Sequence, residues 1–221
     1  MRKNQERGTK NRKKEANFTP FEAQSRMKSQ KRMRGVEKEM HEISEVLEEL
    51  CKTVKRVSYE EETAIASAIQ KAKRVFVAGS GRSGLIASCF AMRLMQSGIT
   101  AYRVGECTTP AIEADDLLLI TSGSGETGAL VKNAETAKKV GAKIALITIY
   151  PESAIGKMAD VILQIAASSK FDEGKKSHSI QPMGSLFEQS LMICSDYIMM
   201  ILMEQLGLTG ESMFQRHANL E

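Results

Sequence analysis

Short apolar runs alternate with longer segments of helical period along most of the chain. The run at 74–78 lacks a strict apolar–polar alternation, which suits a parallel strand buried on both faces. Five runs have the length of a strand: 74–78, 100–104, 117–121, 143–149 and 161–165. Strands that alternate with helices in this way predict an α/β fold, a doubly wound five-stranded parallel sheet with helices on both faces.

Two helical regions flank this core. Apolar residues recur every three or four positions over 36–57, which predicts an N-terminal helix with one apolar face. Ser58, with Glu61 three residues later, has the spacing of a capping box and predicts the start of a second helix. Residues 183–206 read as one long helix that is apolar on most sides. Such a helix suits a position between the sheet and another subunit.

Charge is unevenly distributed along the 221 residues. The overall net charge is +4, but residues 1–38 alone carry 13 Lys and Arg against 4 Glu, so the rest of the chain is mildly acidic. Residues 1–34 have few apolar side chains and predict a disordered basic extension ahead of a folded domain at 35–221. A basic arm can bind nucleic acid, but this one holds few aromatic residues for stacking, and a solvated extension is favoured.

The composition is that of a globular protein, with 42% apolar and 26% charged residues. No apolar run approaches the 18 or more residues of a membrane span, and no signal peptide is present, so a cytoplasmic protein is expected. The cysteines are scattered, without a CxxC motif or metal-ligand spacing, which predicts no metal site and mostly buried thiols. They are Cys51, Cys89, Cys107 and Cys194.

A loop rich in glycine and hydroxyl groups follows the run at 117–121 and opens a helix. A strand, a glycine turn and a helix N-terminus together direct free backbone N–H groups at an anion. The loop contains Ser122, Gly123, Ser124, Gly125, Glu126 and Thr127. A simple N-cap needs a single hydroxyl, so three hydroxyls among glycines favour a site for a phosphate monoester.

A second glycine loop follows the first predicted strand. Its Gly79-x-Gly81-x-x-Gly84 pattern matches the dinucleotide fingerprint, with Glu106 roughly where the ribose acid would lie. One dinucleotide needs only one such turn, however, and the 122–128 loop matches the pattern as well. Two loops of this kind at one edge of a sheet better suit a small sugar phosphate, with Arg82 and Ser83 as polar contacts.

Candidates for proton transfer are few. Glu188 lies in the first turn predicted for the long apolar helix, where it would point towards the strand ends and be partly shielded from water. A carboxylate that merely interacts with the helix dipole is the alternative. Of the three histidines, His41 and His178 lie in polar surroundings, and His217 lies in a C-terminal tail that Phe214 and Leu220 are expected to anchor.

Four segments together resemble the sugar isomerase (SIS) domain family and, within it, the 6-phospho-3-hexuloisomerases. The two glycine loops are typical of SIS domains in general. More specific are Gln-Pro-Met-Gly-Ser-Leu-Phe-Glu at 181–188 and His-Ala-Asn-Leu-Glu at 217–221. The resemblance covers about residues 36–221 and implies a flavodoxin-like SIS fold.

This resemblance also implies a function. It implies cofactor-independent interconversion of 3-hexulose 6-phosphate and fructose 6-phosphate through a cis-enediol, in the ribulose monophosphate pathway of formaldehyde fixation, by a homotetramer. Glu188 would be the base and His217 would assist, in its own or a neighbouring subunit's site. The loop at 122–127 would hold the phosphate, and the sugar would contact Gly81, Arg82 and Ser83.

Three alternatives remain open at this point. The chain could be another SIS isomerase acting on a pentose or heptose phosphate. It could be a sugar-phosphate sensor that regulates DNA through the basic extension, which predicts salt-dependent DNA binding. A nucleotide-binding dehydrogenase ranks last.

Overall fold

The computed structural model describes residues 27–28, 42–167 and 179–220. The chain divides into two units, Met1–Glu45 and Val46–Glu221. In the first unit, residues 42–45 are helical. Nearly all of the predicted extension at 1–34 and the first part of the predicted helix at 36–57 lie outside the described residues. The boundary predicted between residues 34 and 35 therefore stays a prediction.

Five parallel strands form one sheet in the second unit, in the order β2-β1-β3-β4-β5. This confirms the predicted architecture, with boundaries that differ by one or two residues from the apolar runs. The strands are β1 Val75–Gly79, β2 Ala101–Arg103, β3 Leu117–Thr121, β4 Lys143–Thr148 and β5 Val161–Gln164. The chain crosses from β2 back over β1 to β3, so the switch point of the sheet lies between β1 and β3.

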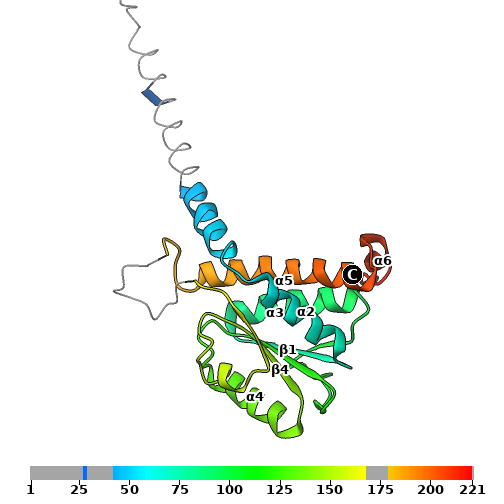
Figure 1. Cartoon of the computed structure of the whole chain (residues 1–221). Helices are drawn as coiled ribbons and strands as arrows, with labels where there is room; N and C mark the ends of the chain where they lie inside the picture. Colours follow the sequence, from blue (N-terminus) through cyan, green and yellow to red (C-terminus); the bar gives the residue numbers. More distant parts are fainter. Residues whose placement is uncertain (1–26, 29–41, 168–178, 221) are drawn as a thin grey trace, which may run out of the picture. The chain divides into compact units, whose positions relative to one another are not determined.

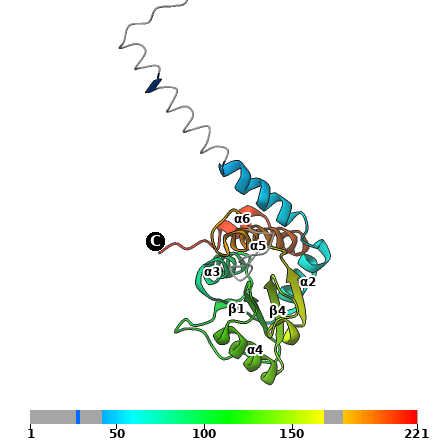
Figure 2. The same cartoon turned by 90° about the vertical axis from the view of Figure 1, so that its left-hand side faces the viewer.

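Helices cover both faces of the sheet (Figures 1 and 2). On one face lie α2 Tyr59–Lys71, α3 Gly81–Gln96 and α5 Ser185–Leu206. On the other lie α4 Gly128–Val140 and the short 3₁₀ helix η1 Gly156–Met158. Alternate residues of each central strand enter the two cores, as Val75 and Val77 do on the α5 side and Phe76 and Ala78 on the α4 side. Both cores are therefore apolar, which explains the lack of alternation in the sequence.

Local signals set several helix ends. Ser58 accepts a hydrogen bond from Glu61 N at its Oγ (3.3 Å) and caps α2 as predicted. Gly141 (φ 85°) and Gly207 (φ 63°) end α4 and α5 in the left-handed conformation that glycine adopts without steric cost. The residues that follow α5 form the short helix α6, Gly210–Phe214.

The long helix α5 packs one face against α2, α3 and the sheet. Its other face exposes Met192, Ile193 and Met200. By length and composition alone α5 could cross a membrane, although the sequence contains no uninterrupted apolar run of that length. A core helix with a buried face has the same composition, and α5 has such a face.

Two expectations about burial are wrong. Phe214 is 73% exposed and Leu220 99%, and Met213, at 9%, is the residue that anchors the C-terminal segment. A short tail buries only the side that meets α5. Cys194 is buried, but Cys51 and Cys107 are exposed, because one lies on the outer face of a helix and the other in a surface turn.

Candidate active site

The loops that follow β1 and β3 meet at the switch point of the sheet. Gly79 and Thr121, the last residues of these strands, are paired in the sheet register. Thr121 donates a hydrogen bond from Oγ1 to the Ser83 carbonyl oxygen (3.2 Å), which ties the two loops together. The carboxyl ends of adjacent strands at a switch point are the usual place for a ligand in this class of sheet.

Glycines are required in the first loop because the backbones approach closely. A Cβ atom added to Gly79 would lie 2.6 Å from Thr121 Oγ1 and 2.8 Å from Gly84 Cα. Gly81 has φ 58°, which turns the chain directly into α3. Packing of strand against helix thus accounts for the fingerprint spacing, and the turn places Arg82 at the start of α3.

Arg82 links the first loop to the start of α5. Its Nη1 donates to Ser185 Oγ (2.9 Å) and to Glu188 Oε2 (3.0 Å). The side chain of Arg82 is 50% exposed and that of Glu188 is 18% exposed. Within the described residues, these bonds leave Nε and Nη2 of Arg82 without a protein partner. The guanidinium can therefore bind a ligand oxygen while it stays beside the carboxylate.

The second loop is organised by its own hydroxyl groups. Ser122 Oγ accepts from Gly125 N (3.1 Å), and Ser124 Oγ accepts from Glu126 N (3.2 Å). Their O–H groups remain available as donors. Thr127 is the N-cap residue of α4 and makes no capping hydrogen bond with its side chain. The loop thus combines hydroxyl donors with the N-terminus of a helix, as an anion site requires.

Residues after β4 support this loop from behind. The Gly123 carbonyl accepts from Ile149 N (3.1 Å) and from Thr148 Oγ1 (3.2 Å). Glu126 accepts from Ala154 N at its Oε1 (2.7 Å). The carboxylate of Glu126, a predicted substrate contact, is thus bound to the protein backbone. Sequence reasoning missed this support, since it joins segments about 25 residues apart and has no local signature.

The second loop also contacts the first turn of α5. A Cβ atom added to Gly123 would lie 3.3 Å from Phe187 Cδ1, the residue before Glu188. The predicted phosphate loop, Arg82 and Glu188 therefore belong to one site at the edge of the sheet. Sequence reasoning also missed Ser185, which shares Arg82 with Glu188. Its position within the 181–188 motif was the only available signal.

His217 lies elsewhere in the same chain. It lines a cavity of about 320 Å³ with Met199 and Met203 of α5 and Arg93 of α3. Glu188 lies in the first turn of α5, about 16 Å along the helix axis from Met199 at 1.5 Å per residue. Figure 1 shows α6 and the C-terminus at the far end of α5 from its first turn. His41 and His178 lie outside the described residues.

The described residues contain no group of three His, Cys, Asp or Glu side chains arranged to hold a metal ion. The site just described has instead one carboxylate, one guanidinium and a set of hydroxyl and amide donors. This set suits binding of an anionic, polyhydroxylated ligand beside a single proton-accepting group.

Residues 68–197 match the family model of the SIS domain. The chain belongs to the SIS domain family. Relatives named 3-hexulose-6-phosphate isomerase, from Bacillus subtilis (strain 168) and Mycobacterium gastri, are each 46% identical to it. Both alignments cover 81% of this chain, with 97% of the first relative and 89% of the second.

A solved structure from Methanococcus jannaschii is 33% identical, with a TM-score of 0.70 over 82% of this SIS-domain chain and 99% of that one. A molecular function of 3-hexulose-6-phosphate isomerase was inferred for that protein. The fold similarity thus extends over almost the whole of the neighbour and includes both loops and α5.

Proposed function

We propose that this chain catalyses the isomerisation of D-arabino-3-hexulose 6-phosphate to fructose 6-phosphate. The observation that carries the proposal is the 46% identity to relatives of that name over nearly their whole length. The geometry agrees with this substrate class, since the loop at 122–127 suits a phosphate and Arg82 and Glu188 lie beside it. We also propose that the enzyme is cytoplasmic and works in the ribulose monophosphate pathway.

The reaction moves a carbonyl group from C3 to C2. Glu188 removes the proton from C2 of the open-chain sugar, and the electron pair forms a C2–C3 double bond as the C3 carbonyl becomes an enediolate. The proton is then returned to C3, and the O2 proton is transferred to O3, which leaves the carbonyl at C2. Arg82 and the donors of the first loop stabilise the oxyanion. No cofactor is needed, because the reaction has no net gain or loss of electrons.

We propose that His217 acts in the site of a neighbouring subunit of a homotetramer. Two observations support this arrangement. His217 lies at the opposite end of α5 from Glu188 in its own chain, and α5 exposes an apolar face with Met192, Ile193 and Met200. A second subunit on that face would cover the apolar side chains and would bring another His217 to the site.

The first experiment measures formation of fructose 6-phosphate from 3-hexulose 6-phosphate by the full-length chain and by Glu188→Gln. We expect turnover by the wild type and a loss of about a thousandfold or more in the variant, the range for removal of a general base. Glu204→Gln, an exposed residue at the other end of α5, is the matched control and should retain activity. No turnover by the wild type would refute the proposal.

Mixing two inactive variants tests the shared site. Glu188→Gln and His217→Ala are unfolded and refolded together. If His217 acts across subunits, the mixture should recover about a quarter of the wild-type activity, since a site is intact only when both of its donors are unmutated. No recovery, from subunits shown to have exchanged, would place His217 in its own chain's site or outside catalysis.

A further inference from the structure

A carboxylate outside the site, Glu49, contacts the segment that leads into α5. Ser179 Oγ donates to Glu49 Oε2 at 2.7 Å, and Gln181 Nε2 donates to the same atom at 3.0 Å. Ile180 N donates to Glu49 Oε1 at 3.3 Å. Three consecutive residues thus donate to one carboxylate, which uses both of its oxygen atoms.

The helix that carries Glu49 is fixed against the core. Residues 46–54 are helical, Leu50 packs on the main apolar cluster, and Thr53 is only 5% exposed. Gln181, which faces Glu49, is 8% exposed, so part of the contact is shielded from water. A carboxylate that accepts several hydrogen bonds away from water holds its donors firmly.

The segment held by Glu49 continues directly into the proposed active site. Gln181 is followed by a turn in which Ser185 N donates to the Pro182 carbonyl (3.1 Å). Met183 in this turn has φ 55° and is 74% exposed. A left-handed conformation is unfavourable for a methionine and persists only where flanking contacts fix it. Glu188 N then closes the first helical hydrogen bond of α5 on the Gly184 carbonyl (3.0 Å).

We propose that Glu49 is a positioning residue for Glu188. It fixes residues 179–181, which hold the strained turn at Met183, and that turn sets where α5 starts and therefore where Ser185 and Glu188 meet Arg82. The inference rests on the proposed function for the catalytic role of Glu188. It extends the site to a helix that no ligand needs to touch.

The neighbouring Glu48 provides a contrast on the same helix. Its side chain is 70% exposed, and it pairs with Lys52 at 3.8 Å, the spacing of an ordinary surface ion pair. Glu48→Gln therefore removes the same charge and makes the same change in atoms as Glu49→Gln. It leaves the segment before α5 untouched and serves as the matched control.

The test combines kinetics with amide hydrogen exchange on the full chain. Glu49→Gln leaves one acceptor oxygen where there were two and presents an amide N–H₂ to a donor. We expect kcat to fall about tenfold or more, as a small misplacement of a catalytic group costs, with KM for 3-hexulose 6-phosphate within about twofold. Exchange at the Ile180 and Glu188 amides should speed up about tenfold. Glu48→Gln should change none of these.

Each other outcome has a defined meaning. If exchange rises at Ile180 while kcat and exchange at Glu188 are unchanged, the contact is only structural and the proposal is wrong. A rise in KM alone would also overturn it. Should Glu49→Gln fail to fold, Gln181→Met, which removes one donor at similar volume, is read by the same criteria. A wild type without turnover would refute the proposed function, and exchange at Glu188 would then decide the positioning role.

Discussion

Two Arg–carboxylate pairs lie at opposite ends of β1, and they differ in almost every respect. Arg74 comes just before the strand and pairs with Asp116, and Arg82 comes just after it and pairs with Glu188. The first pair lies at the amino edge of the sheet, away from any proposed ligand. The second lies at the carboxyl edge, in the proposed active site.

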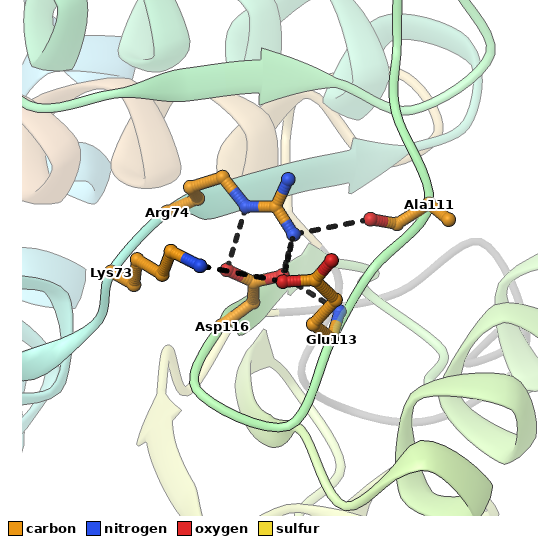
Figure 3. Close-up of polar contacts among 5 residues, drawn as sticks. All are labelled: Lys73, Arg74, Ala111, Glu113 and Asp116. Atoms are coloured by element: carbon orange, nitrogen blue, oxygen red, sulfur yellow. Dashed lines mark hydrogen bonds and ion pairs between the residues drawn. The ribbon is translucent and has the colours of Figure 1, made fainter.

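The pair at the amino edge is fully bonded (Figure 3). Arg74 donates from Nε to Asp116 Oδ1 (2.9 Å) and from Nη2 to Asp116 Oδ2 (2.6 Å), and also reaches the Ala111 carbonyl. Glu113 N donates to Asp116 Oδ2 at 2.7 Å, and the Asp116 side chain has no exposed surface. Little capacity for another ligand remains, so this pair serves the fold.

The pair at the carboxyl edge is only partly bonded. Arg82 uses a single nitrogen for both of its contacts and is half exposed. Exposed pairs of this kind contribute little to stability. The comparison teaches that the same two residue types hold a fold together when each atom is satisfied and can bind a ligand when some atoms are left free.

Asp116→Asn should give the largest effect and should act on stability alone. The substitution leaves Arg74 beside a neutral amide in a mostly buried place, and we expect a loss of about 3 kcal/mol in the free energy of unfolding. Urea unfolding measures it, and Asp115→Asn, an exposed neighbour, is the control. A variant that kept its stability but lost turnover would invert the comparison.

Arg82→Gln should show the opposite behaviour. We expect kcat/KM to fall about a hundredfold, equivalent to about 2.7 kcal/mol of transition-state stabilisation. The free energy of unfolding should change by no more than about 0.5 kcal/mol. Steady-state kinetics and urea unfolding are compared with Arg56→Gln, an exposed arginine in a turn. A large loss of stability would show that Arg82 belongs to the fold.

Glu126→Ala tests the support behind the phosphate loop. Loss of the bond to Ala154 N should loosen the loop and raise KM about tenfold, or about 1.4 kcal/mol, while kcat stays within about threefold. Glu126→Gln retains an acceptor oxygen and should restore KM. If Gln and Ala behave alike, the negative charge itself contributes, and Glu126 contacts the substrate as the sequence resemblance implies.

Local pattern predicted most of the fold. The five strands and the cap at Ser58 follow from the order and spacing of apolar and polar residues, and they are confirmed. Burial of single side chains was predicted less well, as Phe214 and Cys107 illustrate. Burial depends on which side of a short element meets the core, and the sequence does not specify that.

The candidate site was only partly accessible from the sequence. Glycine loops carry their own signature, so Arg82 and Ser122 were found locally. The pair of Arg82 with Glu188 spans 106 residues. It could be expected only because carboxyl ends of parallel strands share an edge and because the 181–188 motif resembles a known family. The roles of these residues stay predictions. The contacts of Glu49 and of Glu126 needed coordinates, since neither has a sequence pattern.

A third carboxylate, Glu62 of α2, extends the comparison with the smallest expected effect. It is 7% exposed. Burial raises the pKa of Glu62, and a hydrogen bond with Cys194 opposes this only in part. Asp116 behaves in the opposite way, since burial would raise its pKa but the bonds from Arg74 and Glu113 N and the charge of Arg74 lower it overall.

The two carboxylates should therefore give opposite pH dependences of stability. Asp116 stabilises the fold above about pH 3.8, its unfolded value, and this contribution is lost as the pH falls through its lowered folded pKa. Glu62 costs nothing below pH 4.5 and destabilises the fold as the pH rises from there through its raised folded pKa. Glu62→Gln should gain on the wild type with rising pH and then level off, in urea unfolding over a pH series. A constant difference between the two proteins would mean that the Glu62 carboxyl does not titrate differently on folding, and that a buried carboxylate here needs no arginine.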